Sequence, residues 1–193
     1  MFDFLFNNKK YGLALGAGGA KGLVHIGVIK ALEELKINIT HIAGSSVGSL
    51  VGGMYALWGD IQKVEGIVLN YDKKRLTELF TTDIALLHGV FKGEKILEEI
   101  EQYIGDGKIE DCKIPFIATS VDILNGERVY HTSGYLKDAI RASISIPFVF
   151  KPYELNGRYL IDGGVAECVP IEAVKSIGAK KTIGVDIQGF PTM

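Results

Sequence analysis

The sequence is poor in the residues that mark unusual classes of protein. It contains 2 cysteines and 5 prolines among 193 residues, and its formal net charge is -2. Cys112 and Cys168 lie far apart and form no C-x-x-C pair, so we expect free thiols in a reducing compartment. Because the net charge is small and no stripe of basic residues alternates with aromatics, we expect no nucleic-acid partner.

Metal-binding and membrane-spanning patterns are also missing. The sequence has no H-E-x-x-H or EF-hand pattern, and its histidines are scattered at positions 25, 41, 88 and 131, so we expect neither a metal nor another cofactor. The apolar start, residues 1–6, is interrupted by Asp3 and is far too short to span a bilayer. It also precedes the basic pair Lys9-Lys10, the reverse of a signal peptide. We therefore expect a cytoplasmic protein.

Two interpretations of residues 1–6 remain open. Their aromatic side chains suit peripheral contact with a membrane surface, with Lys9 and Lys10 directed toward anionic headgroups. Burial of the same side chains in the protein core is the alternative.

The composition is that of one globular domain. Hydrophobic residues make up 47% of the chain and charged residues 23%. A domain of this length buries roughly 70% of the surface that its unfolded chain exposes, so one core is enough. We predict a single domain over residues 1–193, with residues 1–10 as an N-terminal extension. The 24 glycines need a local explanation.

Short apolar runs and helical spacings alternate along the chain. Apolar runs predict strands at residues 11–15, 39–43, 115–123 and 182–187, with a hairpin around Asn156-Gly157 within residues 148–161. Apolar residues spaced by three and four predict helices at 20–35, 47–58, 61–69, 94–104, 135–142 and 170–177. This alternation predicts an α/β fold with three layers, α/β/α, around a mostly parallel sheet.

The pentapeptide Gly44-Ser45-Ser46-Val47-Gly48 lies between a predicted strand and a predicted helix. A Gly-x-Ser-x-Gly turn in this context holds its serine in a strained conformation that presents the hydroxyl group. The following helix directs its free N–H groups and positive dipole end toward developing negative charge. Ser46 is therefore a candidate nucleophile, although the glycines could also serve packing alone.

A second glycine cluster, Gly16-Ala17-Gly18-Gly19-Ala20-Lys21-Gly22, also joins a strand to a helix. Its N–H groups suit a phosphate loop or an oxyanion hole, and a tight turn without a ligand is the alternative. A Walker loop needs its lysine after the last glycine, and the dinucleotide fingerprint needs a glycine where Lys21 stands. Both nucleotide interpretations therefore fail on spacing.

The third motif, Asp162-Gly163-Gly164, places a carboxylate at the end of a predicted strand. A serine nucleophile needs a base within hydrogen-bonding reach. Histidine is the usual base, but in α/β-hydrolases it follows the acid, and no histidine follows His131 here. His25 shares a helical face with apolar residues, so we expect it to be packed and hydrogen-bonded, not catalytic.

Together, these three motifs in this order resemble the patatin-like phospholipase family. The resemblance runs from about residue 11 to residue 187 and includes the segment 141–150 before the aspartate strand. It implies a lipid acyl hydrolase with a catalytic dyad of Ser46 and Asp162 and no histidine. It also implies an oxyanion hole formed by the N–H groups of Gly18, Gly19 and Ala20. The supporting motif residues are Gly16, Lys21, Gly22, Gly44, Gly48, Gly163 and Gly164.

The resemblance predicts a mechanism with an acyl-enzyme intermediate on Ser46 and a lipid or other ester as substrate. An aspartate with a pKa near ~3.9 is a weak base, so we expect catalysis to rest heavily on the oxyanion hole. Two alternatives remain open: an acyltransferase that uses the same dyad, and a regulatory or interaction protein on a hydrolase fold. The sequence distinguishes neither the substrate lipid nor the oligomeric state.

Overall fold

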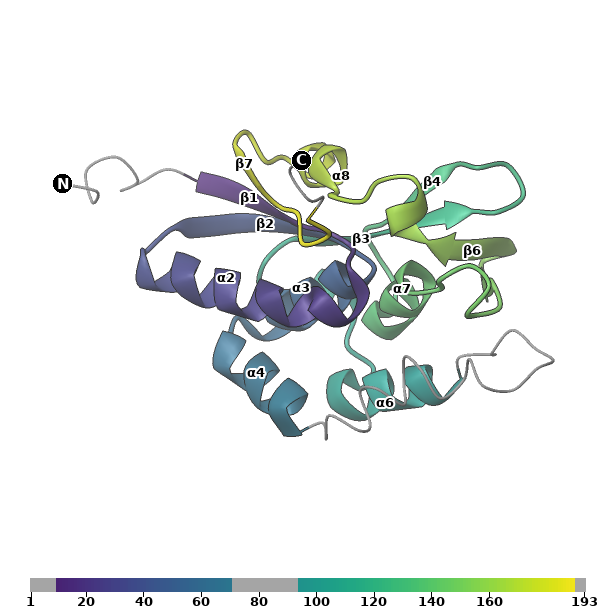
Figure 1. The fold of residues 1–193 in the computed structure, drawn as a ribbon, viewed down its shortest axis with the longest axis horizontal. Helices are drawn as coiled ribbons and strands as arrows, with labels where there is room; N and C mark the ends of the chain where they lie inside the picture. Colours follow the sequence, from purple (N-terminus) through teal and green to yellow (C-terminus); the bar gives the residue numbers. More distant parts are fainter. Residues whose placement is uncertain (1–9, 71–93, 190–193) are drawn as a thin grey trace.

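The computed structural model describes residues 10–70 and 94–189, which form a seven-stranded sheet with helices on both faces (Figure 1). The strands are β1 (Lys10–Leu15), β2 (Asn38–Ser45), β3 (Phe116–Asp122), β4 (Arg128–His131), β5 (Tyr153–Leu155), β6 (Arg158–Asp162) and β7 (Thr182–Val185). The α-helices are α2 (Leu23–Glu34), α3 (Val47–Trp58), α4 (Ile61–Asn70), α6 (Glu94–Ile104), α7 (Leu136–Ser143) and α8 (Ile171–Ser176). Short 3-10 helices are η1 (Gly19–Gly22), η3 (Ile109–Asp111) and η4 (Gly163–Val165). His88 and the apolar residues 1–6 lie outside the described residues.

The sheet is mixed, with a parallel half and an antiparallel half. β7, β1, β2 and β3 are parallel neighbours in this order. β3 then pairs antiparallel with both β4 and β6, and β5 pairs antiparallel with β6. The predicted α/β class with a mostly parallel sheet is therefore confirmed, because the parallel strands follow strand-helix-strand crossovers.

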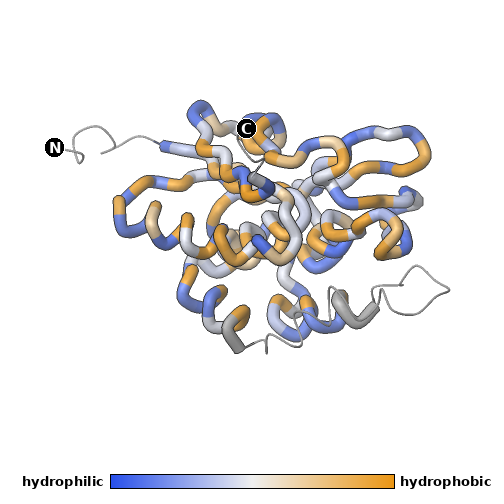
Figure 2. Tube along the Cα trace, viewed as in Figure 1, coloured by the Kyte–Doolittle hydropathy of each residue, from blue (hydrophilic) through white to orange (hydrophobic). Residues whose placement is uncertain are grey.

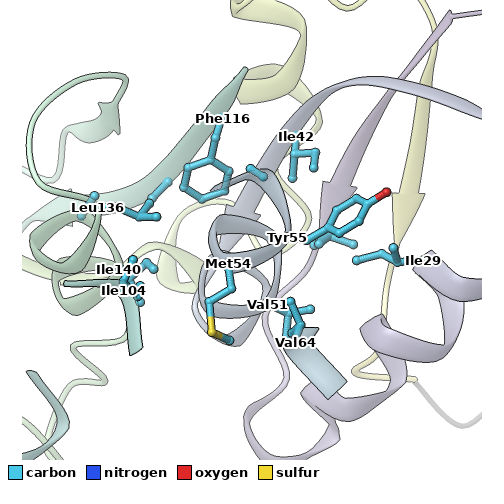
Figure 3. Close-up of a cluster of buried hydrophobic side chains, with 14 of the residues drawn as sticks. Ile29, Ile42, Val51, Met54, Tyr55, Val64, Ile104, Phe116, Leu136 and Ile140 are labelled. Carbon is cyan, nitrogen blue, oxygen red and sulfur yellow. The ribbon is translucent and has the colours of Figure 1, made fainter. Parts of the chain in front are cut away.

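The sheet separates two hydrophobic clusters. On one face α2, α3 and α7 cover the strands, with α4 and α6 outside them, and α8 lies on the other face (Figure 1). Figure 3 shows the larger cluster, where Ile42 and Phe116 from the sheet lie beside Val51, Met54 and Ile140 from the helices. The smaller cluster joins Ala43 and Ile117 to α8. Neighbouring residues along a strand thus face opposite clusters, which explains the nearly continuous apolar strand sequences.

The helices alternate hydrophobic and hydrophilic residues, as α2 and α4 show clearly (Figure 2). This pattern is expected of helices that cover a sheet with one side and meet water with the other. None of the described helices is long and apolar enough to cross a bilayer.

Two features differ from the predicted elements. The sequence pattern did not predict β4, because its four residues are too few to show an alternation. The strand predicted to begin at residue 148 begins only at Tyr153, because residues 144–150 form a loop in which Phe148 has a φ of 68°. A positive φ cannot belong to a strand.

Candidate active site

Ser46 occupies the sharp turn between β2 and α3. Its backbone has φ 54° and ψ -127°, a combination that residues other than glycine rarely adopt. The N–H group of Ser46 donates to Ser143 Oγ of α7 at 2.9 Å, and this bond fixes the turn. The residue is 4% exposed and lies at the N-cap of α3, where the helix dipole favours negative charge.

The flanking glycines allow this turn to form. A Cβ atom at Gly48 would lie 2.1 Å from the carbonyl oxygen of Leu15, and one at Gly44 would lie 2.4 Å from the carbonyl oxygen of Gly48. No side chain fits in either position, because the first turn of α3 packs directly on the ends of β1 and β2. The strained turn that the sequence predicted at Ser46 is present.

The glycine cluster lies beside this turn. A Cβ atom at Gly22 would approach Val47 to 2.0 Å, so η1 packs against the start of α3. In the described part of the chain, the N–H groups of Gly18, Gly19 and Ala20 have no hydrogen-bond acceptor, whereas their neighbours on both sides do. These N–H groups are free to bind an anionic oxygen.

Asp162 reaches the neighbourhood of Ser46 through the register of β3. Thr119 of β3 pairs with Ser45 of β2 on one side and with β4 on the other. The next residue, Ser120, pairs with Asp162 of β6 and again with β4. Because β4 occupies one edge of β3 at both positions, β2 and β6 share the other edge and meet there end to end. Asp162 therefore follows directly where β2 ends.

The direction of β6 decides where Asp162 lies. An aspartate at the carboxyl end of a parallel strand would reach the active-site edge by the usual rule for α/β sheets. β6 runs antiparallel to β3, and the antiparallel register instead places Asp162 opposite Ser120.

The Asp162 carboxyl group is buried, with 5% of the residue exposed. Burial raises its pKa to about 6, against the opposing effects of the Ser46 hydroxyl and the Gly164 N–H group. Gly164 donates to Oδ1 at 2.7 Å, while Oδ2 makes no hydrogen bond of standard geometry. The expectation of an ordinary pKa was therefore wrong, since burial makes this carboxylate a stronger base.

The Asp162-Gly163-Gly164 turn also contacts the glycine cluster. A Cβ atom at Gly164 would lie 2.7 Å from the Cβ of Ala17, and one at Gly163 would lie 2.3 Å from Thr119 Oγ1. Three motifs that are far apart in the sequence thus pack against one another. The Ser46 turn, the glycine cluster and the Asp162-Gly163-Gly164 turn therefore lie together.

The two other indicated side chains lie around the glycine cluster. His25 is fully buried, and its Nε2–H donates to the carbonyl oxygen of Gly16 at 2.8 Å, which confirms the expected packed and hydrogen-bonded histidine. Burial lowers the pKa of His25. Lys21 is exposed, and its ammonium group donates to the carbonyl oxygen of Gln188 at 2.9 Å.

The segment before β6 supplies contacts to the site that the sequence pattern did not assign. Ser143 of this segment accepts the N–H of Ser46. The carbonyl oxygen of Ser145 accepts the N–H of Asp162 at 2.9 Å. The buried Arg141 donates to Ser145 Oγ at 2.6 Å and packs on the ring of Phe150. The sequence signal for these contacts was the presence of small polar residues and one arginine in an apolar segment. Buried polar groups need hydrogen-bond partners, so such residues indicate polar contacts inside the fold.

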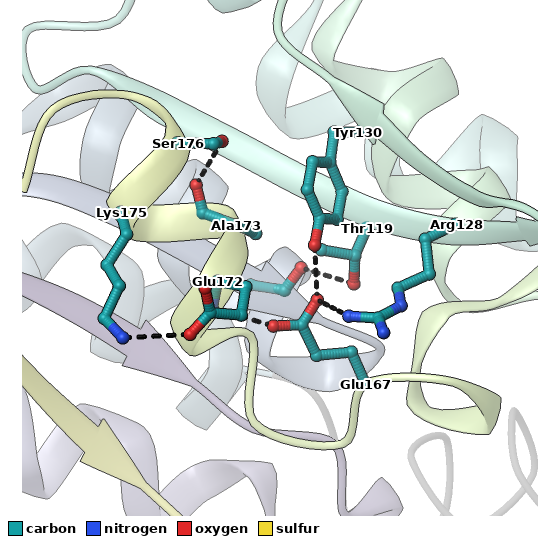
Figure 4. A network of polar contacts seen from close by, with 9 residues as sticks. Thr119, Arg128, Tyr130, Glu167, Glu172, Ala173, Lys175 and Ser176 are labelled. Atoms are coloured by element: carbon teal, nitrogen blue, oxygen red, sulfur yellow. Dashed lines mark hydrogen bonds and ion pairs between the residues drawn. The ribbon is translucent and has the colours of Figure 1, made fainter.

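Glu167 anchors the chain that follows η4 (Figure 4). Its carboxylate accepts hydrogen bonds from the Tyr130 hydroxyl at 2.7 Å and the Glu172 N–H at 2.9 Å, and lies 3.6 Å from the Arg128 guanidinium. The next carbonyl, that of Cys168, accepts the N–H of Ala17 at 2.9 Å. Glu167 thereby fixes a segment that supports the glycine cluster.

Within the described residues, no group of three or more histidine, cysteine, aspartate or glutamate side chains is arranged to hold a metal ion.

The chain is similar to several known proteins. The family profile described as "Patatin-like phospholipase" matches residues 13–175. An NTE family protein of Mycobacterium bovis is 38% identical over 95% of this chain, and "Lysophospholipase NTE1" of Yarrowia lipolytica is 33% identical over 95% of it. The chain spans 50% of the first relative and 13% of the second. The crystal structure of VipD from Legionella pneumophila covers 81% of this chain with a TM-score of 0.55 at 14% identity, and this chain covers 46% of VipD.

Proposed function

Since the chain belongs to the patatin-like phospholipase family, we propose that it hydrolyses acyl esters of lipids with Ser46 as nucleophile and Asp162 as general base. The observation that carries the proposal is the strained Ser46 turn beside a buried carboxylate whose pKa is about 6. A base of this strength is ionised at neutral pH and accepts a proton more readily than an exposed aspartate.

In the proposed mechanism, Asp162 takes the hydroxyl proton of Ser46 while the oxygen attacks the ester carbonyl carbon. The developing oxyanion accepts hydrogen bonds from the free N–H groups of Gly18, Gly19 and Ala20. Collapse of this intermediate expels the alcohol, which takes the proton from Asp162, and leaves an acyl ester on Ser46. Asp162 then takes a proton from water as the water oxygen attacks the acyl ester. Collapse of this second intermediate releases the carboxylic acid, and the departing Ser46 oxygen takes the proton back from Asp162.

A lysophospholipid is the first substrate to test, because the yeast relative is named a lysophospholipase. A short activated ester should be tested beside it, because such a substrate needs only the dyad and the oxyanion hole. Comparison of the products with and without an added alcohol acceptor separates hydrolysis from acyl transfer.

We predict that Ser46→Ala abolishes hydrolysis of both esters while the fold is retained. Alanine removes the nucleophile, and its small side chain adds no bulk to the turn. A fluorophosphonate probe should label the parent chain at the peptide that contains Ser46 and should not label Ser46→Ala. Ser49→Ala is a matched control, since Ser49 is also buried on α3 and its hydroxyl only donates to the Ser46 carbonyl oxygen at 2.6 Å. Turnover by folded Ser46→Ala above a few per cent of the parent rate would reject Ser46 as nucleophile.

A further inference from the structure

Phe148 is held outside the protein in a strained conformation. It is 97% exposed, the largest fraction among the exposed large hydrophobic residues described, and its backbone φ is 68°. Both properties are unfavourable for a bulky aromatic residue. The loop nonetheless fixes this position, because the N–H groups of Val149 and Phe150 both donate to the carbonyl oxygen of Ile146, and Phe150 is buried.

This loop borders the dyad, and so do other exposed apolar side chains. The loop is attached to β6 by the hydrogen bond from the Asp162 N–H to the Ser145 carbonyl. Leu23 and Val24 follow the glycine cluster at the start of α2 and are 50% and 53% exposed, and Val165 of η4 is 58% exposed. Figure 1 shows the start of α2, the end of β6 and the end of α7 around the same end of the sheet.

The exposed charged side chains in these segments are lysines. Residues 18–24, 144–151 and 163–167 contain Lys21 and Lys151, both exposed, and a single carboxylate, Glu167. Glu167 is already engaged by Tyr130 and Arg128. These segments therefore present two exposed lysines, and one exposed carboxylate, Asp186, lies in the neighbouring segment that accepts the Lys21 hydrogen bond.

We propose that this face docks on an anionic lipid bilayer, with Phe148 inserted among the acyl chains and Leu23, Val24 and Val165 around it. An inserted aromatic side chain with lysines at its rim fits the apolar interior and charged headgroups of such a surface. The inference deepens the proposed function, since docking in this orientation brings lipid esters to Ser46. The binding itself does not require turnover.

Vesicle co-sedimentation tests the proposal on the full chain carrying Ser46→Ala, which leaves the lipid unconsumed. Vesicles of phosphatidylcholine with phosphatidylglycerol should bind it, and vesicles of phosphatidylcholine alone should bind it more weakly. Phe148→Asn should weaken binding about tenfold or more, because the apolar insertion is lost. Asparagine tolerates a positive φ, so this variant keeps the loop conformation. Leu35→Asn is the matched control, because Leu35 is 63% exposed at the other end of α2, and binding should not change.

Three further measurements complete the test. Phe148→Trp should bind at least as well as the parent, and its emission should shift to shorter wavelength on the mixed vesicles. Lys151→Gln should weaken binding to the mixed vesicles about fivefold, as expected for one lysine near an anionic surface. With Ser46 present, Phe148→Asn should lose activity on vesicle lipids and keep activity on a short soluble ester.

The proposal is overturned if the parent does not bind the mixed vesicles, or if Phe148→Asn binds them as well as the parent. It is also overturned if Phe148→Asn converts a dimer to a monomer, by light scattering, without affecting vesicle binding, since a second copy would then occupy this face. Failure of the proposed function would look different. The chain would then bind vesicles but would neither react with fluorophosphonate nor hydrolyse an ester.

Discussion

At the scale of single residues, the fold holds both members of the proposed dyad in states that cost free energy. A non-glycine residue with the backbone of Ser46 costs about 1–3 kcal/mol, and Asp162 is buried where its charged form is disfavoured. Such costs are typical of functional sites, because the same features present a nucleophile and strengthen a base.

The pKa of Asp162 predicts the pH dependence of ester hydrolysis. The base must be unprotonated, so the rate on a short soluble ester should rise through pH 6 and level off above pH 7. Asp162→Asn preserves the acceptor for the Gly164 N–H but not the base, and the rate should fall about 10²–10⁴-fold. Steady-state rates from pH 4.5 to pH 8.5 test both statements. Near-normal activity of Asp162→Asn would remove Asp162 from the mechanism.

His25 is predicted to position the glycine cluster without taking part in proton transfer. Its Nε2–H serves the Gly16 carbonyl, and its Nδ1 is buried without a hydrogen-bond partner. His25→Leu leaves that carbonyl unsatisfied, so we expect kcat to fall about tenfold with little change in KM. His25→Gln, which retains an N–H donor, should recover most of the loss. If folded His25→Gln is as inactive as Ser46→Ala, the histidine is the base and the dyad is wrong.

At the scale of secondary-structure elements, the site depends on close backbone contact between the starts of two helices. η1 leads into α2 and packs on the first turn of α3, with Gly22 against Val47. Both turns carry groups of the proposed mechanism: the free N–H groups before Gly22 and the hydroxyl before Val47. Their contact therefore sets the distance between the proposed nucleophile and the proposed oxyanion hole.

Gly22→Ala should destabilise the protein by about 1–3 kcal/mol and lower activity, because the new Cβ would lie 2.0 Å from the stiff side chain of Val47. Gly27→Ala is the matched control within α2. Gly27 is exposed in the middle of the helix, and a Cβ atom there would meet nothing within 4 Å, so alanine should stabilise the protein by about 1 kcal/mol. Urea unfolding and ester turnover measure both effects. Equal stability of the two variants would contradict this prediction, because it would show that η1 moves away from Val47 at little cost in free energy.

At the scale of the whole molecule, β3 is the strand that assembles the site. It pairs with β2 at Thr119 and with β6 at Ser120 along the same edge, so the two site strands end against each other. β3 is buried along its whole length between the two hydrophobic clusters. A slip of β6 by one residue would turn Asp162 to the opposite face, and burial of the apolar residues opposes that slip.

Burial of Asp162 should appear in the stability of the whole fold. Its folded pKa of about 6 exceeds the ordinary value of 3.8, so the folded state binds the proton more tightly and stability falls as pH rises through this window. Asp162→Asn cannot titrate. Its stability relative to the parent should therefore increase by about 3 kcal/mol between pH 3.5 and pH 7.5. Unfolding in urea at several pH values measures the difference, and a pH-independent difference would contradict the raised pKa.

The local elements could be read from the sequence alone. Helical spacing located α2, α3, α4, α6, α7 and α8 to within a few residues, and apolar runs located β1, β2, β3 and β7. The turn at Ser46 and the glycine cluster were also predictable, because strained turns and close backbone contacts require glycine at particular positions. These features depend on neighbouring residues in the chain.

Tertiary structure decided what depends on long-range register and burial. That Asp162 lies beside the end of β2 follows from the pairing of β6 on β3, which no local pattern specifies. Its raised pKa follows from burial by several distant segments. The exposure of Phe148 likewise emerges only when its flanking residues are packed in place. Sequence patterns thus determined the helices and strands and identified the candidate chemical groups. The packed sheet decided how these groups are placed relative to one another, because distances and solvation are properties of the assembled fold.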